Sequence, residues 1–309
     1  MKKLLTFLFL LTVTSAFGQQ LRWIPFAWES ATLAGRHFDK VAIMVPVTLD
    51  NLPHKFNMQL DLGAINTMVY GNSIDPYLAN YPAFKTKLDT TSTFRIEGRK
   101  NPKLVGASIT LGSVSFGTHD IGYFKNFGAK LTPATLADKA QVHIGTIAPD
   151  LFQNQILIID YPHKRLCVTN KIPAEYAHAS FQPFKLNDGR IKIPLRINGV
   201  QQDLLFDTGS SLFALLTTEQ RANQTATETV KDSVKTSTWG EYYYVYDRRT
   251  KAPIYFGEKK LSPALVFADK LQKFDKFYEQ EHIWGMTGNA YFLQNTIIID
   301  YRNHVFGVQ

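Results

Sequence analysis

The sequence predicts a β-dominated protein built from two related halves. Three observations lead to this fold class. Strand-like runs recur along the whole chain, one hairpin-like segment is written twice, and a short Asp-x-Gly pattern precedes each copy. The chain has 309 residues, of which 45% are hydrophobic and 19% charged. This composition is far from the disordered regime and is sufficient for a sizeable core.

The first eighteen residues have the pattern of an export signal. Lys2 and Lys3 precede the apolar run Leu4–Val13, and small residues stand at Ala16 and Gly18. The apolar run is roughly half of the ~20 residues needed to span a membrane, so a transmembrane anchor is the weaker interpretation. We expect cleavage after Gly18. The mature chain is then predicted to be exported, periplasmic or extracellular, monomeric and without a membrane anchor.

One segment occurs twice, at Gly145–Val168 and Gly285–Val308. The two copies align without a gap and share the run Ile-Ile-Asp-Tyr, which ends at Tyr161 and Tyr301. Each is a β-branched run, a polar turn and a second apolar stretch, which predicts a buried β-hairpin. The repeat unit of about 140 residues indicates a domain-sized duplication. The predicted divisions are a signal peptide over 1–18, a first lobe over 19–172, a linker over 173–188 and a second lobe over 189–309.

Local periodicity predicts the remaining elements. Strands are expected over Val41–Leu49, Ser108–Leu111, Ser113–Phe116, Ile191–Ile197, Tyr242–Tyr246 and Ile254–Phe256. Short helices are expected over Pro133–Ala140 and Thr217–Asn223, the latter capped by Thr217 or Thr218 with Glu219 in its first turn. The segment Leu21–Lys40 is expected to add a strand or a covering segment, anchored by Trp23, Phe26 and Trp28.

Several function classes are disfavoured by composition and motifs. The formal charge is +8, but the basic residues are dispersed, so we expect no nucleic-acid partner. Cys167 is the single cysteine, which excludes an intrachain disulfide and predicts a buried, unreactive thiol in an apolar strand. His143 is expected to be a packed histidine. No metal motif, P-loop or dinucleotide fingerprint is found in the sequence, so neither a metal nor a cofactor is expected.

Each half carries an Asp-x-Gly turn after an apolar strand. The first reads Asp61-Leu62-Gly63-Ala64 and the second reads Asp207-Thr208-Gly209-Ser210-Ser211. Glycine permits a sharp turn and lets another backbone approach closely. One isolated copy would be interpreted as an ordinary strand-end turn. Two copies in corresponding places predict that Asp61 and Asp207 meet where the two halves join, and interfaces of this kind commonly form sites.

These motifs resemble those of the pepsin-like aspartic proteases, a family of bilobal all-β peptidases. The elements His143-Ile144-Gly145 and Ile283-Trp284-Gly285 add to the resemblance, because each leads into an Ile-Ile-Asp-Tyr hairpin. The resemblance implies two β-barrel-like lobes, related by a pseudo-twofold axis, around a central cleft. It also implies an endopeptidase that acts on peptide or protein substrates. In such a site Asp61 and Asp207 share a proton and activate a water, supported by Gly63, Thr208, Gly209 and Ser210.

The first turn departs from the family pattern. Family members usually carry a hydroxyl residue directly after each catalytic Asp and another two residues later, as Thr208 and Ser210 do. Leu62 and Ala64 carry no hydroxyl. A hydrogen bond to a charged group is worth ~1.5–3 kcal/mol, so Asp61 is expected to be the less stabilised anion and Asp207 to carry more of the shared charge. The alternative is a pseudo-protease that binds peptides or other ligands in the interlobe cleft without cleaving them.

Two hairpins are candidates for the cover over the cleft. In the family a first-lobe hairpin usually presents a tyrosine, but the corresponding stretch here, Thr93–Pro102, has a turn at Gly98 and no tyrosine. The second half offers the aromatic stretch Trp239–Tyr246, which makes Tyr242 and Tyr244 candidate substrate-binding residues alongside Gly98. The alternative is an ordinary strand with one aromatic face.

Overall fold

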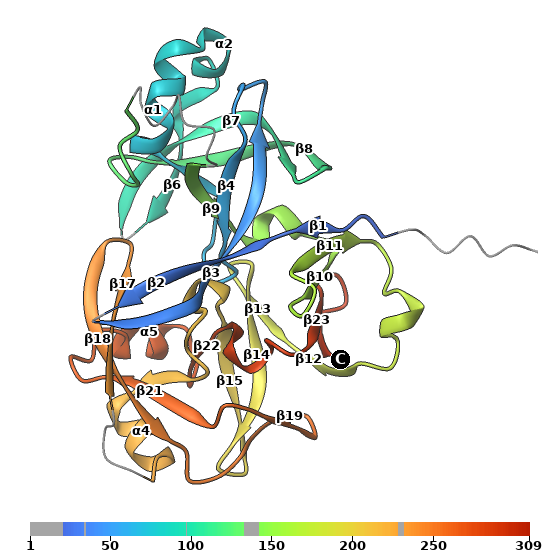
Figure 1. The fold of residues 1–309 in the computed structure, drawn as a ribbon, viewed down its shortest axis with the longest axis vertical. Coiled ribbons are helices and arrows are strands. Elements are labelled where there is room, and N and C mark those ends of the chain that lie inside the picture. The colour runs from blue at the N-terminus through green and yellow to red at the C-terminus, as the bar shows by residue number, and fades with distance from the viewer. Residues whose placement is uncertain (1–20, 34, 97, 133–141, 228–231) are drawn as a thin grey trace, which may run out of the picture.

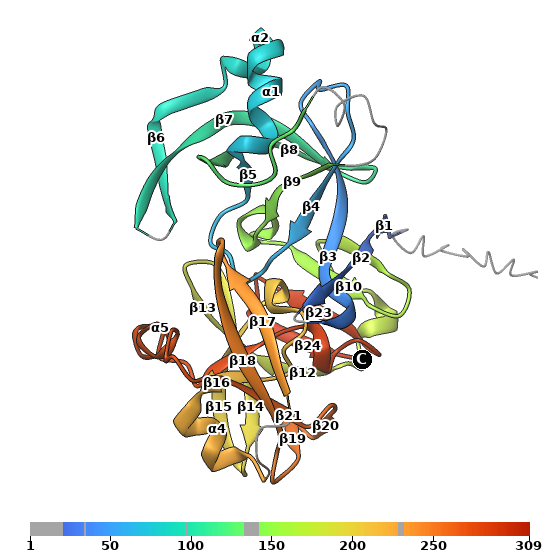
Figure 2. The same cartoon turned by 60° about the vertical axis from the view of Figure 1, so that its left-hand side comes forward.

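The computed structural model describes residues 21–33, 35–96, 98–132, 142–227 and 232–309. Three sheets dominate these residues, with a few short helices (Figures 1 and 2), which confirms the β-dominated class. The predicted signal peptide and the predicted helix over Pro133–Ala140 lie outside the described residues.

An eight-stranded sheet contains most of the first half and occupies the upper part of Figure 1. Its order is β2 (Ala27–Leu33), β3 (Arg36–Leu49), β4 (Phe56–Leu60), β9 (Val142–Ile147), β5 (Met68–Tyr70), β8 (Val114–Phe124), β7 (Arg99–Leu111) and β6 (Leu88–Ile96). Strand β3 also pairs with β7, so the sheet curls on itself. Two helices, α1 (Gly71–Asn80) and α2 (Pro82–Lys85), lie at the top of the figure.

A ten-stranded sheet contains most of the second half. Its order is β17 (Asp232–Thr238), β18 (Glu241–Arg249), β21 (Leu265–Asp269), β16 (Leu216–Thr218), β22 (Gly285–Thr287), β15 (Val200–Phe206), β14 (Arg190–Ile197), β19 (Ile254–Phe256) and β20 (Lys259–Leu261), with β13 (Lys185–Asn187) on β14. Helices α4 (Glu219–Thr225) and α5 (Asp275–Gln280) belong to the same half.

The two large sheets share one strand order. The path β3-β4-β9-β5-β8-β7-β6 in the first corresponds to β14-β15-β22-β16-β21-β18-β17 in the second. The parallel pairs also correspond, because β4–β9 and β5–β8 match β15–β22 and β16–β21. As a result β4 and β15, the strands that lead into Asp61 and Asp207, occupy equivalent interior positions.

A six-stranded sheet joins the two halves. Its order is β1 (Ile24–Pro25), β11 (Arg165–Thr169), β10 (Ile156–Asp160), β23 (Thr296–Asp300), β24 (Val305–Val308) and β12 (Ser180–Pro183). The repeated segments form the predicted hairpins β10–β11 and β23–β24. Strands β10 and β23 pair antiparallel with Ile158 opposite Ile298, so the two copies of the repeat contact each other directly.

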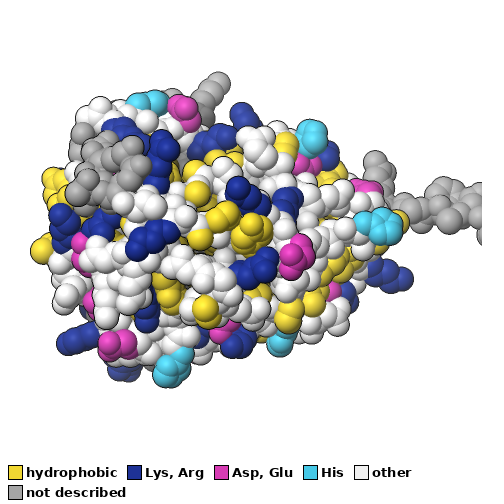
Figure 3. Space-filling view, turned by 90° about the horizontal axis from the view of Figure 1, so that it is seen from below, with side chains coloured by type: hydrophobic (Ala, Val, Ile, Leu, Met, Phe, Trp, Pro, Cys, Tyr) yellow, Lys and Arg dark blue, Asp and Glu magenta, His cyan; other side chains and the backbone are white. Residues whose placement is uncertain are grey.

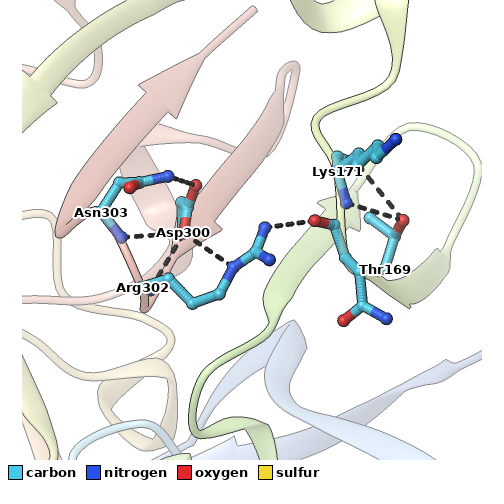
Figure 4. A network of polar contacts seen from close by, with 6 residues as sticks. Thr169, Lys171, Asp300, Arg302 and Asn303 are labelled. Atoms are coloured by element: carbon cyan, nitrogen blue, oxygen red, sulfur yellow. Dashed lines mark hydrogen bonds and ion pairs between the residues drawn. The ribbon is translucent and has the colours of Figure 1, made fainter.

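The aspartate of each repeated hairpin stabilises a turn. Asp300 is buried and accepts hydrogen bonds from the backbone N–H groups of Arg302 (2.9 Å) and Asn303 (3.1 Å) and from the Asn303 amide (2.7 Å). Figure 4 shows these contacts. Arg302 also donates to the carbonyl of Asn170, beyond the end of β11, and thereby links the two hairpins. Asp160 has an equivalent role, accepting from the ring and backbone of His163.

The remaining predicted elements agree with the structure in part. The segment Leu21–Lys40 supplies strands β1 and β2, with Trp28 stacked 6.1 Å from the ring of Tyr161. Helix α4 begins after Thr218, whose hydroxyl accepts from the N–H of Arg221, so the predicted cap is confirmed. The stretch predicted as a linker contributes strands β12 and β13, which pair at sheet edges.

On the face shown in Figure 3, the one at the foot of Figure 1, basic side chains alternate with acidic and apolar ones.

Candidate active site

The two Asp-x-Gly turns are anchored in the same way. Strand β4 ends at Leu60, and the N–H of Asp61 donates to the carbonyl of Ile147 (2.9 Å) at the end of the parallel neighbour β9. Strand β15 ends at Phe206, and the N–H of Asp207 donates to the carbonyl of Thr287 (2.9 Å) on β22. Each aspartate is therefore fixed at the carboxyl end of an interior strand, by a hydrogen bond to the parallel strand beside it.

Each carboxyl group lies against the glycine of the opposite turn. A Cβ atom placed on Gly63 would be 2.4 Å from Cγ of Asp207, and one on Gly209 would be 2.7 Å from Cγ of Asp61. Real Cβ atoms do not approach other atoms closer than 3.0 Å. A side chain at either position would therefore displace the opposite carboxyl group, and the structure brings together the two aspartates that the sequence singled out.

A single hydroxyl braces the two turns. Thr208 is fully buried, and its Oγ1 accepts from the N–H of Leu62 (2.9 Å) and donates to the carbonyl of Leu60 (2.8 Å). Leu62, the residue of the first turn that corresponds to Thr208, has no hydroxyl and cannot make the equivalent hydrogen bonds to the second turn. Its side chain is buried in the core instead. At the two turns, the Thr208 hydroxyl therefore links the second half to the backbone of the first.

The two carboxyl groups differ in their hydrogen bonds. Asp207 accepts from the N–H groups of Gly209 (2.8 Å) and Ser210 (3.2 Å) and from the Ser210 hydroxyl (2.7 Å). Among the described residues, Asp61 accepts from two groups, the N–H groups of Gly63 (3.0 Å) and Ala64 (3.1 Å). The missing third donor is the hydroxyl that Ala64 does not carry, so Asp207 is the better stabilised anion.

The electrostatics follow the same asymmetry. Burial, the negative charge of Asp207 and a hydrogen bond between the two carboxyls raise the pKa of Asp61 well above its usual value of 3.8. The N–H groups of Gly63 and Ala64 oppose this rise without cancelling it. We conclude that Asp61 is the carboxyl group that retains a proton.

A cavity of about 730 Å³ surrounds the carboxyl pair. Strand β17 borders it with the consecutive residues Thr236, Ser237 and Thr238. Because side chains alternate along a strand, three consecutive lining residues mean that the edge of the strand itself faces the cavity. Strand β17 ends its sheet, so this edge has no strand partner. The end of β6, the last strand of the other large sheet, also borders the cavity.

The β17–β18 hairpin covers the cavity and contacts the opposite half. Its tip residues Trp239 and Gly240 line the cavity and both have positive φ angles (44° and 92°), as two-residue type I′ hairpin turns require. The Trp239 ring lies edge-on to Phe124 and Phe127 of the first half, at centroid distances of 5.9 and 6.0 Å. Figure 2 shows this hairpin rising toward the eight-stranded sheet.

The three predicted substrate-binding residues do not line this cavity. Gly98 lies at the tip of the β6–β7 hairpin, with φ of 72°. Tyr242 and Tyr244 are 71% and 45% exposed on the outer face of β18, whereas Tyr243 between them is buried and lines the cavity. A run of consecutive tyrosines has no polar alternation, so the sequence did not indicate which face points inward. The dipeptide Trp239-Gly240 was the signal in the sequence that could have located the hairpin tip at the cavity.

His143 and Cys167, the two other residues noted in the sequence, pack against other side chains of the protein. His143 contacts the ring of Tyr70 edge-on (5.3 Å), and burial lowers its pKa. Cys167 is fully buried, and burial raises its pKa to about 12, as expected for an unreactive thiol. Within the described ranges, no group of three or more His, Cys, Asp or Glu side chains is arranged to hold a metal ion.

No protein-family model matches the sequence, and no curated protein matches it significantly. Among the described residues, no helix is both long enough and apolar enough to cross a membrane.

Proposed function

We propose that this protein is an exported aspartic endopeptidase that hydrolyses peptide bonds with a water activated between Asp61 and Asp207. The observation that carries the proposal is the reciprocal packing of each carboxyl group against the glycine of the opposite turn. Two carboxyl groups held this closely do not both ionise comfortably, so the pair retains one proton. General acid–base hydrolysis needs one acid and one base at the same place.

The sheet topology supports a bilobal pepsin-like architecture. The two large sheets share their strand order, and the repeated hairpins pair with Ile158 opposite Ile298. A pseudo-twofold axis through that pair would relate the lobes and carry Asp61 onto Asp207. The cavity would then be the cleft between the lobes. Export follows from the signal-like residues 1–18.

The asymmetry of the pair assigns a role to each carboxyl group. The Asp207 carboxylate accepts a proton from the water, whose oxygen attacks the carbonyl carbon of the substrate. The Asp61 carboxylic acid donates a hydrogen bond to the carbonyl oxygen as negative charge develops there. When the tetrahedral intermediate collapses, the C–N bond breaks and the proton held by Asp207 passes to the departing amine. No covalent link to the protein forms.

The borders of the cavity suit an extended peptide. At Thr236, Ser237 and Thr238, strand β17 borders the cavity along an edge that pairs with no other strand of the described residues. An extended chain can pair with such an edge through main-chain hydrogen bonds, while its alternate side chains fill pockets. This mode of binding tolerates many sequences, which is typical of peptide-bond substrates.

The alternative function is a protein that binds peptides or other ligands without cleaving them. Leu62 and Ala64 favour it, because the first turn lacks the second brace and the third donor to its carboxyl group. Such a protein would keep the cavity and the peptide-binding edge while losing the chemistry.

Cleavage of a mixed peptide library distinguishes the two functions. The library is incubated with the mature chain at several acidic and neutral pH values, and products are identified by mass spectrometry. An endopeptidase gives internal cuts that disappear in both Asp61→Asn and Asp207→Asn. The absence of cuts at every pH, with retained peptide binding, would instead favour the binding protein.

A further inference from the structure

A buried cluster with surplus positive charge lies beside Asp207. Nη2 of Arg190 donates to Oε1 of Glu281 (2.6 Å), and Nζ of Lys192 lies 3.5 Å from Oε2 of the same carboxylate. The side chains of Arg190, Lys192 and Glu281 are only 8%, 10% and 13% exposed. One carboxylate therefore serves two cations, and these three buried side chains together carry one net positive charge.

Glu281 has little capacity left to serve Arg190 further. Its Oε2 already accepts from the amide of Asn187 (2.6 Å) in addition to the contact with Lys192. Nε of Arg190 is buried and has no hydrogen-bond partner among the described residues. A buried cationic donor without an acceptor is costly, so the guanidinium has both charge and donor capacity available for a further anion.

The position of Arg190 directs this capacity toward the carboxyl pair. The paired register of β14 on β15 begins with Lys192 opposite Leu205. Arg190 and Asp207 each lie two residues along the chain from that pair, at the same end of the two strands. Arg190 and Asp207 both line the cavity, as do the apolar neighbours Leu205 and Met286. The guanidinium is itself buried, with the ring of Phe277 centred 5.7 Å from its Cζ, so a charge interaction at this point is weakly screened.

We infer that Arg190 binds a carboxylate group of the peptide, one or two residues from the scissile bond. This inference rests on the proposed function and specifies its substrate class as acidic peptides. The carboxylate can come from an Asp or Glu side chain or from the C-terminus of a peptide, because guanidinium recognises both through the same paired donors. Asp188 also borders the cavity, but its side chain is exposed and its charge is screened by solvent.

The test compares matched peptides that differ only in the carboxylate. One series places Glu, Gln or Leu at each position flanking the cleaved bond, and a second carries a free or amidated C-terminus close to that bond. The ratio of kcat/KM between the acid and its amide is measured for each pair. The expected ratio is about tenfold or more at one position, because a hydrogen-bonded charge contributes that much discrimination. The series that shows the preference identifies the source of the carboxylate.

Variants connect the preference to Arg190. Arg190→Gln leaves Lys192 to neutralise Glu281 one to one, so the cluster stays balanced, and the acid-to-amide ratio is expected to fall to about one. Arg190→Lys keeps the charge and is expected to retain part of the preference. The control is Lys185→Gln, which removes one charge from the exposed end of the Lys185–Asp203 pair, outside this cavity. It is expected to keep the wild-type ratio.

Absence of any acid preference in the wild type overturns the inference, whatever the folding of the variants. A preference that persists undiminished in a folded Arg190→Gln protein overturns it as well. If the wild type cleaves no peptide, the proposed function fails, and the same acid and amide peptides are compared by isothermal titration calorimetry. Tighter binding of the acids that is lost in Arg190→Gln then still supports the inference, whereas equal binding of acids and amides overturns it.

Discussion

At the scale of single residues, the two carboxyl groups differ by one hydrogen bond from a hydroxyl group. Ser210 donates to Asp207 through its side chain, whereas Ala64 offers Asp61 only its backbone N–H. The proton therefore rests on Asp61, whose pKa is raised by burial and by the charge of Asp207. The same asymmetry affects the stability of the fold, because a carboxyl group that resists ionisation opposes folding at neutral pH.

Asp61→Asn is expected to stabilise the protein increasingly as the pH rises. Below about pH 3.8 Asp61 is protonated in both the folded and unfolded states, so the substitution has little effect. Above this value the unfolded chain ionises while the folded protein still holds the proton, and the wild type loses up to about 1.4 kcal/mol of stability per pH unit from this group. The loss continues as the pH rises through the raised pKa. Urea unfolding of both proteins between pH 3 and 7 measures the difference.

The control for this experiment is Asp203→Asn, which removes a carboxylate paired with Lys185 at the surface. Its unfolding free energy should follow that of the wild type without a growing gain. A constant difference between Asp61→Asn and the wild type over the whole pH range would show that Asp61 does not hold a proton in the folded state.

Thr208 is expected to be the most sensitive single hydroxyl in the protein. Thr208→Val has the same shape but leaves the N–H of Leu62 and the carbonyl of Leu60 without their buried partner. Each unpaired buried group costs about 1–3 kcal/mol of unfolding free energy. Thr208→Ser retains the hydroxyl and should lose much less. Chemical denaturation measures the unfolding free energy of both variants. Equal stability of Thr208→Val and Thr208→Ser would show that the hydroxyl of Thr208 does not stabilise the two turns.

At the scale of elements, each half extends a hairpin over the other. The β17–β18 hairpin brings Trp239 onto Phe124 and Phe127. In the other direction, Leu33 and Phe38 of the β2–β3 hairpin pack against a core cluster that includes Leu205 and Phe213. Figure 1 shows the β2–β3 hairpin reaching β17 and β18, and Figure 2 shows the β17–β18 hairpin rising toward the eight-stranded sheet. Both hairpins contribute lining residues to the cavity, Leu33 from the first half and Trp239 from the second.

Trp239→Ala is expected to weaken peptide binding about tenfold, because the tip loses two aromatic contacts worth about 0.5–1.5 kcal/mol each. The effect should appear mainly in KM, since the ring lines the cavity without contacting the carboxyl pair. Tyr242→Ala, on the exposed face of the same hairpin, is the matched control and should bind peptides normally. If the two variants bind peptides equally well, the hairpin is not the cover.

Local patterns predicted the repeated hairpins and the two Asp turns, because each depends on a short run of residues. The duplication also predicted that Asp61 and Asp207 meet, but features without such a repeat were not predictable. Arg190 carries no local signal that it would line the same cavity as Asp207. No helix was predicted over α1, whose sequence contains Pro76, yet the helix forms and buries Ile74, Tyr77 and Leu78. Tertiary burial outweighed the local penalty of proline in that element.

At the scale of the whole molecule, the six-stranded sheet makes the two halves interdependent. Strands β10 and β23 come from different halves and are hydrogen-bonded to each other. Arg302 adds a side-chain link between the corresponding hairpins, shown in Figure 4. Separation of the halves would expose both repeated hairpins, so we expect the chain to unfold as one unit.

Ile298→Ala tests this cooperativity. Ile298 is fully buried opposite Ile158, and truncating it should cost about 2–5 kcal/mol of unfolding free energy. Tryptophan fluorescence and far-UV circular dichroism should still report one coincident transition in urea. Leu271→Ala is the control, because Leu271 is exposed and its loss should change stability by less than about 0.5 kcal/mol. Two separate transitions in the Ile298→Ala protein would indicate that the halves fold independently.

The central claim is that Asp61 and Asp207 act together as one acid and one base. Its most direct test is the pH dependence of kcat/KM for a single cleaved peptide, measured for the wild type, Asp61→Asn and Asp207→Asn under identical conditions. We expect a bell-shaped profile for the wild type, since one proton must be shared by the pair, and no measurable cleavage by either variant at any pH. Substantial cleavage by either single variant would contradict it.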